Sequence, residues 1–439
     1  MTSAAPTVTI LAPGISPIGA RDSSPDRRVL PWPAWSMYLA ISWTWCIGMF
    51  LPVLLIRDFG WWGYFAFLLP NCIGSALMGR VLTAETSRDI FAHHGTMIRL
   101  FSLVTAGFQA FFMGWIASGA GFGPFAGGVL AIAISVPAAL LPFVRTVLAK
   151  VVIALCTLTF IASILLVGGS LLIEGQPQIA QIAKAAPLTG QLLWLMPVCV
   201  FGFALCPYLD GTFHTALRAS APKQGRAFGV GFMVLFAVMA LLTPLYAGWL
   251  SNANFGLMLV VWPVALHMLL QTSLTIFLHG QALSSDASLA AGQSPAPRQA
   301  ARSNLQSLPL AGVVAAAAIL GAAAPEIPDY AGLTGPELVY RAFLVFYGLV
   351  FPAYVWICII PFRGKRPALR RGVAIWIGAV VLALPCFWVG FIERQTWWLA
   401  VGLGVMALAK CLPSGSSLRV FRAASLVRRA AFTKPAGRR

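Results

Sequence analysis

The sequence predicts an all-α, polytopic membrane protein of about 12 transmembrane helices, and three observations lead to this fold class. Hydrophobic residues make up 59% of the 439 positions, charged residues only 10%, and the mean hydropathy is +0.84. A soluble domain carries about 25% charged residues. The charged residues also lie in short clusters between long apolar runs, as expected where lipid replaces water as the solvent.

Each expected span is an apolar run of about 20 residues, the length that crosses the hydrocarbon core of a bilayer. The first six are Trp35–Ile56, Trp61–Leu82, Leu100–Ser118, Gly121–Val144, Val151–Ile173 and Leu192–Leu217. The second six are Phe228–Leu250, Leu257–Phe277, Leu308–Ala324, Val339–Ile360, Val373–Phe391 and Trp397–Leu412. Between spans, Thr83–Thr96 is expected to be a solvated loop and Ser284–Ser307 a flexible linker.

The distribution of positive charge predicts the orientation of the chain, because Lys and Arg are retained on the cytoplasmic side. With the N-terminus inside, the segments assigned to the cytoplasm hold 26 of the 30 Lys and Arg residues. The four left outside are Arg57, Lys184, Arg341 and Arg394. We therefore expect a multi-pass protein of the cytoplasmic (inner) membrane with both termini inside.

Three domains follow from this layout: a cytoplasmic tail at 1–33, a transmembrane domain at 34–412 and a basic cytoplasmic tail at 413–439. The net charge of +18 is explained by topology, so no nucleic-acid partner is expected. The basic tail is expected to lie against anionic lipids of the bilayer. No phosphate-binding loop, HExxH, GxSxG or dinucleotide motif is present, which argues against ATP-driven pumping by this chain and against the familiar hydrolase classes. No cofactor is expected, and no oligomeric state is predicted.

Two spans contain helix-breaking residues, which are tolerated at membrane depth only around a cavity or a protein-lined site. They are Gly48–Pro52 in the first span and Gly202–Gly211, which contains Pro207, in the sixth. Counting five spans from each segment pairs spans 1–5 with spans 6–10, and because five is odd the second set would start on the opposite side of the membrane from the first, as an inverted repeat requires. The alternative is a pair of ordinary proline-kinked helices.

On these segments, and on Thr272 and Ser273 in the eighth span, the chain resembles the amino acid, polyamine and organocation transporter superfamily, in particular its sodium:solute symporter branch. The resemblance implies discontinuous helices 1 and 6, with repeat one at 34–173, repeat two at 192–361 and extra helices at 372–412. It also implies secondary active transport of a small-molecule substrate by alternating access, with Na⁺ or H⁺ as the coupling ion. The substrate itself is not predicted.

The resemblance further implies an ion site, in which the Thr272 and Ser273 hydroxyls join backbone carbonyls that the broken first span releases near Cys46 and Met49. Sodium prefers such oxygen ligands. The alternative is that both hydroxyls bond to their own helix or join two helices.

Six residues are candidate substrate ligands: Gly48, Asn71, Gln109, Gly202, Asp210 and His214. Asp210 follows the Pro207 break, where a carboxylate is costly unless it faces a cavity or a partner. His214 lies one turn later on the same face. The alternative for Asp210 is that it caps the helix end or pairs with Arg218. The alternative for Asn71 and Gln109 is that they form hydrogen bonds between helices and do not bind substrate.

Two other functions remain open from the sequence. A membrane-embedded enzyme or metal-dependent protein would use Asp210, His214 and His267, although a metal needs at least three protein ligands. A sensory or scaffold membrane domain would keep the helices without transport. Broken helices that meet at mid-membrane favour transport, convergence of the three side chains favours the enzyme, and continuous helices favour the scaffold.

Overall fold

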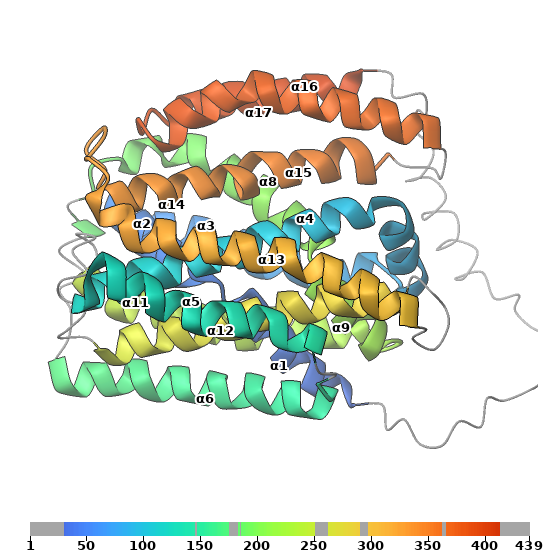
Figure 1. Ribbon diagram of the computed structural model, residues 1–439. Helices are drawn as coiled ribbons and strands as arrows, with labels where there is room; N and C mark the ends of the chain where they lie inside the picture. Colours follow the sequence, from blue (N-terminus) through green and yellow to red (C-terminus); the bar gives the residue numbers. More distant parts are fainter. Residues whose placement is uncertain are drawn as a thin grey trace, which may run out of the picture.

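The structure is a computed structural model that describes residues 30–144, 147–174, 183–184, 186–250, 262–289, 297–361 and 366–412. Over these residues the chain is helical, apart from turns and one two-residue bridge between Tyr330 and Leu333. The helices lie side by side in a bundle, and most of them run along one common direction (Figure 1).

The helices follow the apolar runs of the sequence. Those of the first half are α1 (Trp32–Trp43), α2 (Cys46–Phe59), α3 (Trp61–Val81), α4 (Ala84–Ala117), α5 (Gly123–Val144) and α6 (Ala149–Glu174). Those of the second half are α8 (Leu192–Leu205), α9 (Gly211–Ser220), α10 (Gln224–Val230), α11 (Ala237–Leu250), α12 (Trp262–Leu289), α13 (Pro297–Ala323), α14 (Gly335–Val345), α15 (Phe351–Tyr354), α16 (Arg366–Phe391) and α17 (Trp397–Cys411). Short π-helical turns join α10 to α11 at η4 (Gly231–Phe236) and α14 to α15 at η7 (Phe346–Val350).

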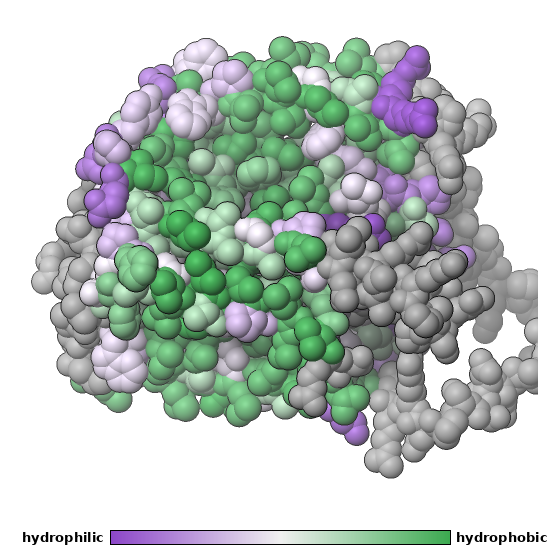
Figure 2. Space-filling model, in the orientation of Figure 1, coloured by the Kyte–Doolittle hydropathy of each residue, from purple (hydrophilic) through white to green (hydrophobic). Residues whose placement is uncertain are grey.

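Seven helical stretches of the described chain are long and apolar enough to cross a membrane, and the bent pair α1–α2 qualifies as an eighth. One of the seven, 84–144, contains both α4 and α5, which meet at the non-helical Gly121. On the face seen in Figure 2, hydrophobic residues cover most of the middle of the bundle, and the most hydrophilic residues lie mainly toward its ends. The chain is therefore an all-α, multi-pass membrane protein.

The predicted loop at Thr83–Thr96 is wrong, because α4 already begins at Ala84. The Thr83 hydroxyl accepts a hydrogen bond from the Thr86 N–H at 3.1 Å, which caps the first turn. His94 is buried, and its Nδ1 hydrogen-bonds with the Tyr354 hydroxyl at 3.0 Å. The segment is thus the first part of a long helix that packs on the bundle.

The predicted linker at Ser284–Ser307 is helical at both of its ends. α12 continues to Leu289 and α13 begins at Pro297, which leaves 290–296 outside the described residues. Proline suits the first position of a helix, since the N–H that it lacks would have no helical acceptor there. The predicted tails, apart from residues 30–33, also lie outside the described residues.

α4 lies at the centre of the bundle and positions the site. It packs against α5, α12 and α13, and α13 lies beside it along most of its length (Figure 1). Gly114 of α4 contacts the Ala318 backbone of α13, and Gly321 of α13 contacts the Phe111 backbone of α4. These two glycines let the helix backbones touch directly.

Candidate functional site

The expected first span is broken at Thr44 and Trp45, between α1 and α2. Trp45 has extended backbone angles, and the two helix axes differ by 56°. The Trp45 indole N–H donates to the Ser42 carbonyl and closes the last turn of α1. The predicted break at Gly48–Pro52 is therefore misplaced, because these residues lie inside α2.

Three hydroxyl groups from neighbouring helices bind carbonyls in the first turn of α2. The donors and acceptors are Tyr340 to Cys46 (3.0 Å), Thr243 to Gly48 (2.9 Å) and Tyr246 to Met49 (2.8 Å). Pro52 has no N–H, so the Gly48 carbonyl lacks its usual helical donor, and the Thr243 hydroxyl replaces that donor. This side-chain bond explains why α2 continues through Pro52.

The second break lies where Pro207 predicts it, and the expected interruption between Gly202 and Gly211 is confirmed. After α8, a 3₁₀ turn covers Cys206–Leu209, and Asp210 has extended backbone angles before α9 begins. A proline inside a helix removes a donor and clashes with the preceding turn. The two halves of this span are thus separate helices.

Asp210 caps α9. Its Oδ1 accepts hydrogen bonds from the Thr212 N–H (2.7 Å) and hydroxyl (2.6 Å), and the side chain is fully buried. Its Oδ2 has no partner among the described residues. His214 hydrogen-bonds instead with the Ser87 hydroxyl (2.8 Å) and the Tyr208 carbonyl (3.0 Å). The expected pair therefore shares a helix but has separate partners.

A small cavity, here called the central cavity, lies between the two helix breaks; the space outside protein atoms in and around it is about 290 Å³, part of it open to the exterior. It is lined by Trp43, Trp45, Ile47, Gly48, Asn71, Gly202, Phe203, Cys206 and Tyr347. Three predicted substrate ligands, Gly48, Asn71 and Gly202, are among them. The Trp43 indole N–H donates to the Asn71 side-chain oxygen. No Lys, Arg, Asp or Glu among the described residues lines this cavity.

The other three predicted substrate ligands, Gln109, Asp210 and His214, do not line the central cavity. Gln109 is fully buried on α4, and its Oε1 accepts a hydrogen bond from the Cys46 N–H at 3.2 Å. Its Nε2 has no partner within the described ranges. Gln109 thus holds the N-terminus of α2 beside the cavity.

The predicted ion ligands Thr272 and Ser273 lie on α12, and both hydroxyls bond within that helix. Thr272 donates to the Met268 carbonyl at 2.9 Å and Ser273 to the Leu269 carbonyl at 2.6 Å. A hydroxyl that donates one bond keeps lone pairs that can still bind a cation. The carbonyls expected beside them, of Cys46 and Met49, already accept hydroxyls from α14 and α11.

The break itself exposes a different carbonyl, that of Thr44, which accepts no hydrogen bond from any described residue. On the same helix as Thr272, His279 is fully buried and its ring lies 5.7 Å from the Trp45 ring, edge on. Neither nitrogen of His279 has a partner in the described part of the chain. Sequence patterns do not identify His279, because a lone histidine in an apolar run carries no spacing signal.

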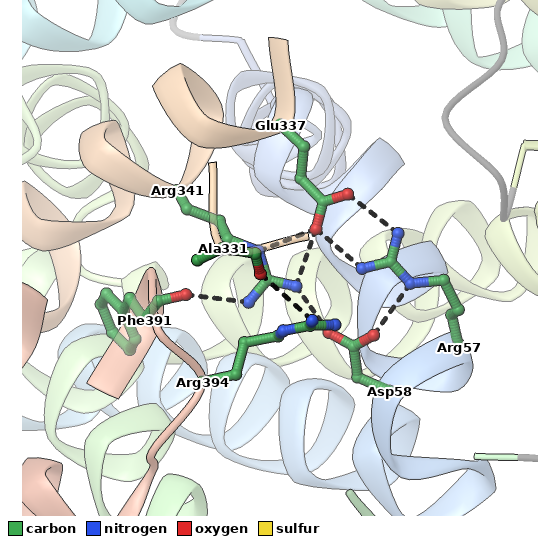
Figure 3. A network of polar contacts seen from close by, with 7 residues as sticks. All are labelled: Arg57, Asp58, Ala331, Glu337, Arg341, Phe391 and Arg394. Atoms are coloured by element: carbon green, nitrogen blue, oxygen red, sulfur yellow. Dashed lines mark hydrogen bonds and ion pairs between the residues drawn. The ribbon is translucent and has the colours of Figure 1, made fainter. Parts of the chain in front are cut away.

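Four charged residues form a cluster where α2 ends and α14 begins (Figure 3). Arg57 binds Asp58 (2.8 Å) and both oxygens of Glu337 (2.7 and 2.9 Å). Arg341 binds Asp58 (2.5 Å) and Glu337 (2.8 Å), and donates to the Phe391 carbonyl (3.1 Å). Both carboxylate side chains are only 3% exposed. This charge cluster ties α2 to α14 across 280 residues of sequence.

In the sequence, Arg57 and Arg341 stand out only as exceptions to the charge distribution. Two further features of the sequence could have identified the cluster: Arg57 and Asp58 are adjacent at the end of an apolar span, and Glu337 and Arg341 are one turn apart at the start of another. Ionisable residues in spans usually face a partner or a cavity. The pairing of Arg57 and Asp58 with Glu337 and Arg341 could not be predicted, because about 280 residues separate the two pairs.

The metal-site alternative finds no support in the geometry. Within the described ranges, no three His, Cys, Asp or Glu side chains lie close enough together to hold a metal ion. His267 packs instead near Tyr246, with ring centroids 6.1 Å apart. Asp210, His214 and His267 therefore do not converge.

The comparisons with known proteins add no family assignment. No family model matches the sequence, and no curated protein matches it.

Proposed function

We propose that the protein is a secondary active transporter that couples a small solute to a sodium or proton gradient by alternating access. The central cavity between the breaks at Thr44–Trp45 and Cys206–Asp210 carries this proposal. Interrupted helices cost backbone hydrogen bonds at membrane depth, so they are retained where the backbone lines a site. Such a site between two half-helices is the binding geometry of transporters built from inverted repeats.

The order of the helices supports the proposal. The break at Thr44–Trp45 lies in the first span of one set of five, and the break at Cys206–Asp210 lies in the first span of the next set. In an inverted repeat these two spans face each other near the middle of the membrane. We therefore propose a five-plus-five inverted repeat within about twelve spans, followed by two extra helices.

The lining of the central cavity also limits the charge and polarity of the solute. Its wall holds the rings of Trp43, Trp45 and Tyr347 and the Asn71 amide, with no charged side chain among the described residues. A charge buried without a partner is very costly, whereas aromatic and amide groups accept a neutral solute with few polar groups. We propose a small, predominantly uncharged substrate in this cavity.

The position of the charge cluster also fits alternating access, because its ion pairs could close one route to the central cavity. It joins α2, which follows the first break, to α14, the helix that also carries Tyr340 to α2. In alternating access, one route to the central site must be closed while the other opens. We propose that these ion pairs close the route at the outer end of the bundle.

Orientation is tested by labelling single cysteines on intact cells, in a background with the exposed Cys411 replaced by Ser. We expect Ser294→Cys, in the segment between α12 and α13, to stay unmodified by an impermeant thiol reagent, and Lys184→Cys, an exposed position, to react. Rapid modification at position 294 but not at 184 would reverse the proposed topology.

Coupling is tested by melting the protein in sodium and in potassium at equal ionic strength. An ion that binds only the folded form adds about 2.7 kcal/mol at about 100 times its dissociation constant, so sodium should raise the melting temperature. Replacing Thr272 and Ser273 together by Ala removes two oxygen ligands and should abolish the sodium-specific rise. Thr157→Ala is the matched control, since it removes a hydroxyl bonded in the same way to its own helix on α6.

The other outcomes separate the alternatives. Equal melting in both salts, with a pH-dependent shift that Asp210→Asn removes, would make the proton the coupling ion. A protein that responds to neither ion would be a scaffold or sensory domain, because a gradient-driven carrier must bind what drives it.

A further inference from the structure

A second, larger cavity lies next to the charge cluster. It holds about 770 Å³ of space outside protein atoms, part of it open to the exterior, between α2, α8, the α14–η7 segment and residues 390–396. Its walls are mainly aliphatic, with Leu51, Leu54, Leu195 and Val198 among them. We call it the lateral cavity. It suits a hydrocarbon chain better than a polar solute.

Its polar rim holds more arginine than carboxylate side chains. Asp58, Arg341 and Arg394 line the lateral cavity, and the cluster supplies Arg57 and Glu337 behind them. Two carboxylates balance Arg57 and Arg341. Arg394 forms no ion pair with any described residue, and its one hydrogen bond goes to the Ala331 carbonyl at 3.2 Å. Three arginines therefore face two carboxylates (Figure 3).

The position of Arg394 is fixed by the backbone around it. Arg394 has a φ of 60°, a left-handed conformation that is uncommon for a residue other than glycine. Gly332 has a φ of 72°, and a Cβ there would lie 2.9 Å from Arg394 Nη2. The 331–332 turn thus leaves room for this guanidinium. The left-handed conformation of Arg394 lies in the turn that follows α16, where the Gln395 N–H donates to the Val389 carbonyl at 3.2 Å.

We propose that the lateral cavity binds an amphipathic organic anion, with its hydrocarbon chain between α2 and α8 and its carboxylate on Arg394. A guanidinium binds a carboxylate through charge-assisted, often bidentate hydrogen bonds. The aliphatic wall excludes a small inorganic anion as the main ligand, and the net positive rim disfavours an amphipathic cation. The lateral cavity adjoins the central cavity, because Ile47, Gly202, Phe203 and Tyr347 line both. The proposal does not depend on transport, because Arg394 lines the lateral cavity alone.

The test is thermal melting of the full chain in nanodiscs of neutral lipid with octanoate, acetate or octyltrimethylammonium at constant ionic strength. We expect octanoate to stabilise the protein and the other two to have little effect. From butyrate to octanoate the apparent affinity should rise by up to about fourfold for each added methylene group.

Two variants assign the effect to Arg394. Arg394→Gln should weaken octanoate binding by about tenfold or more, and Arg394→Lys should keep much of it. Lys184→Gln is the matched control: it removes a positive charge at the same end, where Ala183 contacts Gly60 just after α2, but Lys184 does not line the lateral cavity.

Three results would overturn the proposal: equal octanoate binding by Arg394→Gln and wild type, equal stabilisation by the cation, or no dependence on chain length. If Arg394→Gln melts too low to be tested, Arg394→Lys with octanoate against octanol decides between an anion site and simple partitioning. Failure of the sodium test would leave this result unaffected.

Discussion

Gly321→Ala is expected to destabilise the protein by about 1–3 kcal/mol, because the added methyl group would overlap the Phe111 carbonyl of α4. Backbone atoms cannot rotate aside as a flexible side chain can, so α13 and α4 would have to separate. Alanine also favours a helix by about 1 kcal/mol over glycine, which offsets only part of this loss. Gly114→Ala should behave similarly, since its methyl group would meet the Ala318 carbonyl.

The control is Gly312→Ala on the same helix, where an added Cβ meets nothing within 4 Å. It should be neutral or stabilising by up to about 1 kcal/mol. The measurement is thermal or denaturant unfolding of the purified protein in detergent. Equal stability of the Gly321→Ala and Gly312→Ala proteins would contradict the close contact of α13 and α4.

Arg341→Met is expected to cost about 3–5 kcal/mol, because it leaves Asp58 and Glu337 to share Arg57 alone. Both carboxylates are nearly inaccessible to water, so their charge is poorly compensated by solvent. Arg370→Met, at an exposed position on α16, should change stability by less than about 0.5 kcal/mol.

A double variant checks that the loss comes from pairing. Asp58→Asn with Arg341→Gln should be less destabilising than the sum of the single changes, since the removed groups contact each other. Unfolding free energies of the four proteins give this coupling. An additive result would mean that the Arg341–Asp58 contact contributes nothing to stability.

Hydropathy and proline placement predict much of the fold. The apolar runs predict the helices, and Pro207 predicts the second break, because both effects depend on nearby residues. The first break was misplaced since Pro52 lies inside an intact helix, where Thr243 from α11 satisfies the Gly48 carbonyl. That compensation comes from a helix almost 200 residues away, and no local pattern reveals it.

The site is less predictable than the fold. Gly48, Asn71 and Gly202, chosen from the sequence as candidate substrate ligands, line the central cavity, and their role in binding substrate stays a prediction. Asp210 and His214 share a helix face, yet their partners come from local caps and from α4. Spacing along a helix predicts which side chains are neighbours but not what faces them.

The three hydroxyls on the first turn of α2 have a mechanical consequence. Tyr340 of α14 donates a hydrogen bond to this turn, and so do Thr243 and Tyr246 of α11. A rotation of α2 alone would break three hydrogen bonds at once in a medium without water to replace them. The first turn of α2 is therefore held to both α11 and α14, whereas Thr44 and Trp45 belong to neither α1 nor α2, so a change in the angle between these two helices would fall on the backbone of Thr44 and Trp45.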